Sequence, residues 1–335
     1  MRSSNQPEAR PGRRAGPAAP VTVAVWLSDP VVDCWTLQPT HLRRLRRELP
    51  GARFIPCADA DTFRRALPRA HAAIVWVFRP EWLELAPHLA WIATPAAGRD
   101  YFRVSRPGLD LTYGRFHGRI MGQTVAAMVL AENRGVLASC RAMQAGQAWP
   151  RDILSPVMRT LEETHAVILG FGGIGTWIAR YLKPFGVRIT GVRRHPRAQA
   201  RPAWFEAGDR VAGLGRLEAL LPTADHLILA LPATPETDNL LDARRLALLP
   251  PTAALYNVGR GNAIDETALA RALRAGRLRA ACLDVFRREP LPPSSPLRRA
   301  PNVLLMPHAS AIDPRYLDRF LDEYIPQFQA RYGGG

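Results

Sequence analysis

Short apolar runs alternate with helix-length segments along most of the chain. Near the N-terminus, residues 21–27 (VTVAVWL) and 72–78 (AAIVWVF) are β-branched runs typical of strands, and the Leu/Arg stretch from about 41 to 49 between them has helical spacing. A third apolar segment, 89–93, leads into a loop of small residues at 94–100. Strands that alternate with helices favour a parallel sheet, so the pattern predicts a first α/β unit that ends soon after this loop.

A second α/β series follows a segment that predicts a long helix. Residues 122–138 are small and apolar with few helix breakers, and such a helix could bridge two domains. Six short apolar runs separated by helix-length segments then predict a doubly wound sheet: 166–169, 187–191, 226–231, 253–257, 280–284 and 303–306. A C-terminal helix with a buried face is predicted by apolar residues at spacings near three and four: Tyr316, Leu317, Phe320, Leu321, Tyr324 and Phe328.

The length of 335 residues exceeds what one hydrophobic core usually supports, so it favours two compact units. Hydrophobic residues make up 47% of the chain and charged residues 22%, a composition that excludes a mostly disordered protein. No apolar run approaches the ~18 residues of a membrane span, and we expect no membrane segment. Residues 1–20 combine four arginines with four prolines and lack the apolar stretch of a secretory signal, so we interpret them as a disordered tail.

The charge balance is strongly basic. Lysine plus arginine number 45 against 29 acidic residues, a net charge of +16. Such a field would concentrate small anionic substrates or a phosphate-bearing cofactor. Nucleic-acid binding is the rival interpretation, and the even spread of the arginines argues against it. The densest group alternates with leucines at helical spacing and is typical of a solvated helix face: Arg43, Arg44, Arg46 and Arg47.

The cysteines give no indication of a metal or disulfide site. They are far apart and form no CxxC pair: Cys34, Cys57, Cys140 and Cys282. We therefore expect no bound metal and a reducing, cytoplasmic setting.

A glycine-rich turn lies between a predicted strand and a predicted helix. Its sequence is Gly170-Phe171-Gly172-Gly173-Ile174-Gly175, a GxGxxG motif. The first glycine permits a tight turn, the second lets the backbone approach a pyrophosphate, and the third lets the helix pack close to the sheet. Because the helix N-terminus adds N–H donors, we expect a dinucleotide site formed by Gly170, Gly172, Gly173, Ile174 and Gly175.

The residues after the next strand indicate which dinucleotide is bound. An NAD site would usually place an acidic residue here to bind the ribose 2′-hydroxyl, but the chain has Arg193 and Arg194. These guanidinium groups could bind a 2′-phosphate through charge-assisted hydrogen bonds. We therefore predict that NADP(H) is preferred and that NAD(H) is an alternative. A simpler interpretation is that both arginines belong to an arginine-rich surface.

Three later segments resemble the D-isomer-specific 2-hydroxyacid dehydrogenase family. They are 257–261 (NVGRG), 283–291 (LDVFRREPL) and 306–308 (MPH), and the resemblance extends over about residues 90–312. It implies that the chain reduces a small 2-oxo acid of the glyoxylate or hydroxypyruvate type to the D-2-hydroxy acid, with a nicotinamide dinucleotide as cofactor.

The resemblance assigns three catalytic residues, Arg260, Glu289 and His308. Arg260 would hold the substrate carboxylate or carbonyl oxygen with a forked pair of donors. His308 would deliver a proton to that oxygen, because the ordinary pKa of histidine lies near neutral pH. Glu289 would bind the imidazole, fix its tautomer and favour its protonated form. Each residue alone could be structural, and their joint order after the glycine-rich turn favours the catalytic interpretation.

Further residues are assigned to the cofactor and substrate. The expected cofactor contacts are Leu231, Pro232, Thr237, Asn257, Val258, Gly259 and Asp284. Asp284 would orient the nicotinamide carboxamide or the adjacent ribose. In the loop at 94–100, Ala97 and Gly98 would bind the substrate carboxylate through backbone N–H groups. Arg99 and Arg79 are candidate additional anchors, and solvent-facing arginines are an equally good interpretation.

The family also implies the fold and the assembly. We expect a Rossmann cofactor domain at 121–310 and a flavodoxin-like, split substrate domain at 21–120 with 311–335, and a homodimer formed through the cofactor domains. Small 2-oxo or 2-hydroxy acids are the expected partners, without nucleic acid or membrane. The chain departs from the family pattern at Ala127, Met306 and Ala311.

Two other functions are compatible with the sequence. One is a dinucleotide-sensing regulatory protein, similar to the transcriptional co-repressors that share this fold and the three residues assigned as catalytic. The other is a biosynthetic dehydrogenase of a phosphorylated or phosphonate hydroxy acid, for which Arg79 and Arg99 would be the discriminating residues.

Overall fold

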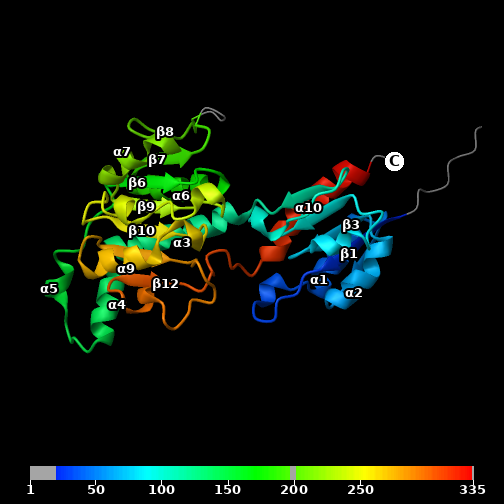
Figure 1. Ribbon diagram of the computed structural model, residues 1–335, viewed down its shortest axis with the longest axis horizontal. Coiled ribbons are helices and arrows are strands. Elements are labelled where there is room, and N and C mark those ends of the chain that lie inside the picture. The colour runs from blue at the N-terminus through cyan, green and yellow to red at the C-terminus, as the bar shows by residue number, and fades with distance from the viewer. Residues whose placement is uncertain (1–19, 197–200, 334–335) are drawn as a thin grey trace, which may run out of the picture.

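The computed structural model describes residues 20–196 and 201–333. The tail predicted for residues 1–20 therefore lies outside the described residues except for Pro20, as does the end of the chain at 334–335. Two sheets with exclusively parallel pairing form two lobes that lie side by side (Figure 1). This arrangement confirms the predicted α/β fold. Among the helices of the described residues, none is both long enough and apolar enough to cross a membrane.

The N-terminal sheet has the order β2-β1-β3-β4-β5, which is that of flavodoxin-like sheets. Its strands are β1 (Val21–Trp26), β2 (Ala52–Pro56), β3 (Ala72–Val75), β4 (Trp91–Thr94) and β5 (Asp110–Tyr113), and its first helices are α1 (Pro39–Glu48) and α2 (Ala60–Ala66). The three predicted apolar runs form β1, β3 and β4. The two edge strands, β2 and β5, were not predicted.

The C-terminal sheet has the order β12-β11-β10-β9-β6-β7-β8, an extended doubly wound arrangement. Its strands are β6 (His165–Leu169), β7 (Arg188–Arg193), β8 (Arg210–Gly213), β9 (His226–Leu229), β10 (Ala254–Asn257), β11 (Ala280–Leu283) and β12 (Val303–Leu305). The helices between them are α6 (Gly173–Leu182), α7 (Leu217–Leu220), α8 (Ala243–Leu246) and α9 (Glu266–Arg274). All six predicted runs form strands, and the edge strand β8 is an unpredicted seventh.

The helix predicted at 122–138 has the wrong bounds. Helix α3 (His117–Asn133) begins and ends earlier and packs against α6. Gly135 then adopts a φ of +67°, a left-handed conformation that interrupts the helix before α4 (Val136–Gln144). Together with α5 (Arg151–Leu154), α4 forms an arm at the outer end of the C-terminal lobe (Figure 1).

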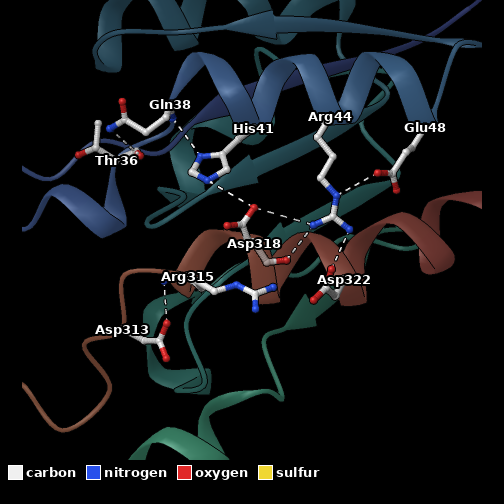
Figure 2. Close-up of polar contacts among 9 residues, drawn as sticks. All are labelled: Thr36, Gln38, His41, Arg44, Glu48, Asp313, Arg315, Asp318 and Asp322. Carbon is white, nitrogen blue, oxygen red and sulfur yellow. Dashed lines mark hydrogen bonds and ion pairs between the residues drawn. The ribbon is translucent and has the colours of Figure 1, made fainter.

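The last helix, α10 (Tyr316–Tyr332), returns to the N-terminal lobe and packs against α1 (Figure 2). All six apolar residues predicted for its inner face are buried. Arg44 of α1 donates to the Asp322 carboxylate at 2.7 Å, to the Asp318 backbone oxygen at 3.2 Å and to Glu48 at 3.0 Å. One arginine of the predicted solvated face therefore holds the C-terminal helix, whereas three remain exposed: Arg43, Arg46 and Arg47.

The carboxyl ends of strands from both sheets meet at the junction between the lobes. Strand β4 leads into the loop at 95–100, β10 leads into the turn that carries Arg260, and Asp100 contacts Arg260 across the junction. The chain passes between the lobes at 114–117 and again at 309–316. Ligands of open α/β sheets bind outside the carboxyl ends of the strands, so this junction is the expected site.

Candidate active site

The glycine-rich turn joins β6 to α6. Gly170 has a φ of +91°, and a Cβ atom added there would lie 2.4 Å from the Ala230 backbone oxygen, so a larger residue would be strained. By contrast, no described heavy atom lies within 4 Å of a Cβ added to Gly172 or Gly173, where α6 begins. The turn therefore leaves open space in front of a helix N-terminus, a geometry that fits a dinucleotide pyrophosphate.

The two arginines after this turn lie at the end of β7. Arg193 is half-buried and donates from Nη2 to the Pro196 backbone oxygen at 2.9 Å. Arg194 is exposed and forms an ion pair of 3.5 Å with Glu236, which follows β9. Glu236 was not singled out in the sequence analysis. Its carboxylate lies where it can compete with a phosphate for Arg194.

The turn after β10 is shaped by Asn257. This buried side chain donates from Nδ2 to the Arg260 backbone oxygen at 3.0 Å and accepts from the Gly259 N–H at 3.0 Å. The Val258 N–H donates to the Leu229 backbone oxygen at 3.0 Å. The turn that carries Arg260 is thus held by the Asn257 side chain and by a backbone hydrogen bond to β9.

The loop after β9 is likewise held by side-chain hydrogen bonds to its own backbone. The Thr237 hydroxyl contacts the backbone oxygens of Pro232 at 2.8 Å and Thr234 at 3.0 Å. The backbone of Leu231 lies close to Gly259, because a Cβ atom added to Gly259 would be 2.5 Å from the Leu231 nitrogen. The loops after β9 and β10, which carry predicted cofactor residues, therefore lie directly against each other.

Asp284 fixes the segment that carries His308. The Asp284 side chain is fully buried, and its carboxylate accepts from the N–H groups of Ala309 at 2.6 Å and Ser310 at 3.1 Å. Its backbone oxygen accepts from the His308 N–H at 2.9 Å, and His308 has a φ of +53°. In this structure, Asp284 holds an unusual backbone conformation at His308 in addition to its predicted place near the cofactor.

His308 and Glu289 form the predicted pair. The distance from His308 Nδ1 to Glu289 Oε2 is 2.7 Å, and Glu289 Oε1 accepts from the Phe286 N–H at 2.9 Å. The hydrogen bond to Glu289 raises the pKa of His308 above its ordinary value, despite burial. Burial opposes ionisation of Glu289, but its hydrogen bonds and the charges of His308 and Arg260 lower its pKa on balance. The pair therefore favours a protonated imidazole beside a carboxylate.

Arg260 contacts the predicted substrate loop. Its Nε and Nη2 atoms each donate to Asp100 at 3.0 Å, and Nη1 donates to the Gly259 backbone oxygen at 3.0 Å. A Cβ atom added to Gly98 would overlap the Arg260 guanidinium, so glycine is required there for this close approach. Burial opposes ionisation of Asp100, but Arg260 and His308 lower its pKa on balance.

Asp100 is the functional residue that the sequence analysis missed. The available indication was its place directly after Gly98 and Arg99 in the predicted loop. The contacts of the other candidate anchors lie within the N-terminal lobe: Arg99 lies over the ring of Tyr113, and Arg79 lies over the ring of Trp82. Both arginines are exposed, as is Ala97. The structure thus brings Gly98, Asp100 and Arg260 together and gives Arg79 and Arg99 separate aromatic partners.

A cavity of about 490 Å³ lies beside the histidine and glutamate. Its lining is mostly apolar and comes from the loops after β11 and β12: Phe286, Glu289, Pro290, Leu291, Arg298, Leu305, Met306, Pro307 and His308. Met306, where the chain departs from the family pattern, therefore lines the same cavity as His308 and Glu289.

Comparisons with known proteins agree with this geometry. Residues 126–310 match the NAD-binding domain of D-isomer-specific 2-hydroxyacid dehydrogenases. A glyoxylate reductase of Aeropyrum pernix is 37% identical over 239 residues, which cover 68% of this chain and 69% of that protein.

Solved structures show the same likeness over most of the chain. A D-isomer-specific 2-hydroxyacid dehydrogenase family protein from Aeromonas salmonicida is 31% identical with a TM-score of 0.74, covering 92% of this chain and 96% of that one. An NADPH-dependent glyoxylate/hydroxypyruvate reductase from Sinorhizobium meliloti, in complex with NADP and sulfate, is 27% identical with a TM-score of 0.74, covering 92% and 95%. The fold, the glycine-rich turn and these matches together place the chain in the D-isomer-specific 2-hydroxyacid dehydrogenase family.

Proposed function

We propose that the protein reduces a small 2-oxo acid, of the glyoxylate or hydroxypyruvate type, to the D-2-hydroxy acid with NADPH. The observation that carries the proposal is the His308–Glu289 pair, in which the hydrogen bond raises the pKa of the imidazole and favours its protonated form. Arg260, whose charge acts on the same imidazole, reaches across to Asp100 in the substrate loop. The similarity to glyoxylate and hydroxypyruvate reductases supports the substrate class.

The substrate binds across the junction between the lobes. Its carboxylate is held by the backbone N–H groups of Ala97 and Gly98 together with Arg260, which also polarises the carbonyl group. Because the positive charge of Arg260 faces the developing negative charge on the substrate oxygen, the transition state gains more from it than the ground state does.

The proton comes from His308. Its Nδ1–H is committed to Glu289, so Nε2 is the nitrogen that transfers a proton to the substrate oxygen. Bound NADPH supplies the hydride for C2 of the 2-oxo acid, and the balance is 2-oxo acid plus NADPH plus a proton giving 2-hydroxy acid and NADP⁺. Closure of the lobes around the substrate excludes water from the site.

The residues around the glycine-rich turn hold the cofactor. The N–H groups of Gly173 and Ile174, at the start of α6, would donate to the pyrophosphate, whereas the Gly172 N–H donates to the Gly170 backbone oxygen at 2.8 Å and shapes the turn. Arg193 and Arg194 would bind the 2′-phosphate that distinguishes NADP. The loops after β9 and β10 would line the nicotinamide side, and Asp284 would act near the carboxamide through the segment that it holds at 308–310.

We also propose a homodimer that forms through the C-terminal lobes. The α4–α5 arm exposes large apolar side chains, among them Val136, Met143 and Ile153, and Trp149 is 76% exposed. A group of exposed apolar residues on one projecting arm is typical of an interface, and a second copy of the chain is its proposed occupant. The four cysteines are free, and we further propose a reducing, cytoplasmic setting.

The alternatives receive less support. The similarity to glyoxylate and hydroxypyruvate reductases favours an enzyme over a regulatory protein that only senses dinucleotides. A phosphorylated substrate would need additional charges such as those of Arg79 and Arg99, which are exposed and lie over rings of the N-terminal lobe. The similarity to glyoxylate and hydroxypyruvate reductases favours a substrate without a phosphate group.

The test is steady-state oxidation of NADPH, with NADH in parallel, across a panel of 2-oxo acids, followed by chiral analysis of the product. We expect turnover with glyoxylate or hydroxypyruvate, a D-configured product where the carbon is chiral, and loss of turnover in His308→Ala. A silent panel, despite tight binding of NADPH by the wild type, would overturn the proposal.

A further inference from the structure

The two passages of the chain between the lobes meet at one pair of side chains. His117 begins α3 after the first passage, and Tyr316 begins α10 after the second. The distance from His117 Nε2 to the Tyr316 hydroxyl oxygen is 2.8 Å, although 199 residues separate them. Both side chains are buried. In Figure 1, the two passages run side by side between the lobes.

The same pair contacts the base of the substrate loop. The Tyr316 hydroxyl donates to the Pro95 backbone oxygen at 3.5 Å. From the first passage, the Gly114 N–H lies 3.0 Å from the Thr94 oxygen and 3.1 Å from the Ala96 oxygen. The segment that precedes the predicted carboxylate-binding residues is therefore bonded to both passages.

The polar contact lies inside an aromatic cluster. Phe116 stacks on His117 with a centroid distance of 4.2 Å and meets Tyr316 edge-on at 4.8 Å. Burial, with a smaller contribution from the charge of Arg260, lowers the pKa of His117 to about 4, so the ring is neutral near pH 7. Because the rings also pack against one another, the hydroxyl group can be removed while the aromatic contacts remain.

We propose that Tyr316 is a positioning residue for substrate binding, because its hydroxyl links the two passages between the lobes, at 114–117 and 309–316, to the backbone of the substrate loop. With the His117 proton on Nε2, the ring donates to the tyrosine oxygen and the hydroxyl hydrogen is directed to Pro95. The link holds Ala97 and Gly98 at the distance at which they share the substrate carboxylate with Arg260. This inference rests on the proposed function.

The first experiment compares Tyr316→Phe with Tyr324→Phe. Tyr324 lies on the same helix and is equally buried, but its hydroxyl has no hydrogen-bond partner among the described residues, so it is a matched control. For Tyr316→Phe we expect KM for glyoxylate to rise by roughly 10-fold, as a buried hydrogen bond is lost, with a smaller change in kcat. The Kd of NADPH, measured by fluorescence in the absence of substrate, should stay within about 2-fold.

A second pair of variants tests the link through histidine. His117→Phe keeps an aromatic ring and removes the partner of the hydroxyl. If the two residues act as one unit, the double variant His117→Phe/Tyr316→Phe has the same KM as the single variants. Additive increases in KM would mean that the residues act separately and would contradict the proposed link. An unchanged KM in Tyr316→Phe would overturn the proposal altogether.

Amide hydrogen exchange provides a readout that needs no turnover. The peptide covering residues 94–101 should exchange faster in Tyr316→Phe than in the wild type, and Tyr324→Phe should match the wild type. Faster exchange in an enzyme that is silent on every 2-oxo acid would reject the proposed function and keep the positioning role. Unchanged exchange in an active enzyme would reject the positioning role alone.

Discussion

Asp100 and Arg260 bind each other through two hydrogen bonds of 3.0 Å, although 160 residues separate them in the chain. Asp100 belongs to the substrate loop of the N-terminal lobe, and Arg260 belongs to the turn after β10. A two-point, charge-assisted pair fixes the plane of a guanidinium group as well as its position. The orientation of the proposed substrate-binding arginine therefore depends on the opposite lobe.

Removing this carboxylate should impair catalysis. In Asp100→Ala, we expect kcat/KM for the best 2-oxo acid to fall by roughly 10- to 100-fold, because a misplacement of about 1 Å at a reacting centre has effects of this size. Asp100→Asn retains one acceptor and should lose less. Steady-state kinetics of the three proteins check the order. A lower KM in Asp100→Ala would show instead that the carboxylate competes with the substrate.

Glu289 should set the pH dependence of reduction. The hydrogen bond from His308 to Glu289 raises the pKa of the histidine, and the reductive reaction requires its protonated form, so activity should fall as pH rises through that pKa. In Glu289→Gln, the largest cause that raises the pKa of His308 is removed; burial and Arg260 still lower this pKa, and only the charge of Asp284 still raises it. The alkaline limb of the kcat/KM profile should therefore move to lower pH. An unmoved limb would assign the titration to another group.

Arg194 and Glu236 should have opposite effects on cofactor choice. Arg194→Ser removes a phosphate ligand, and we expect the NADPH-to-NADH preference in kcat/KM to fall by roughly 10-fold. Glu236→Gln removes the carboxylate that pairs with Arg194 at 3.5 Å, so NADPH binding should tighten while NADH binding changes little. Fluorescence titrations of both cofactors measure each effect. Equal changes for NADPH and NADH would place the 2′-phosphate elsewhere.

The arm should control assembly. Trp149→Glu places a charge in the proposed dimer interface, and light scattering after gel filtration should then give the mass of one 37.1 kDa chain in place of two. Phe185→Glu is the control, because Phe185 is also exposed but lies outside the arm. A wild type that is already monomeric would contradict the interface.

The sequence predicted the centre of each sheet better than its edges. The buried runs of β1, β3 and β9 are continuous and apolar, whereas β2 (ARFIP) and β8 (RVAG) are edge strands with partly polar sequences. A strand that needs burial on both faces carries a strong pattern, and an edge strand does not. The break before α4 rests on one left-handed glycine, Gly135, which the apolar composition of the surrounding segment concealed.

For the site, the sequence located single residues but not all their partners. The approach of His308 to Glu289 could be expected, because the family resemblance pairs them and only 19 residues separate them. The contacts of Arg260 with Asp100 and of His117 with Tyr316 depend on how two lobes meet, and no local pattern encodes that meeting. Loops at the carboxyl ends of strands are the places where such contacts were to be expected.

The buried carboxylate of Asp284 bonds Ala309 and Ser310 to the end of β11. His308, the proposed proton donor, therefore belongs to the same lobe as the glycine-rich turn that is proposed to hold the cofactor. The loop proposed to receive the substrate carboxylate belongs to the other lobe. Each lobe thus supplies one part of the proposed site, the cofactor and proton donor on one side and the carboxylate-binding loop on the other. Hydride transfer therefore requires that both parts are occupied at the same time. A reduced cofactor alone meets no acceptor and a 2-oxo acid alone meets no donor, so reducing equivalents are spent only when both are present.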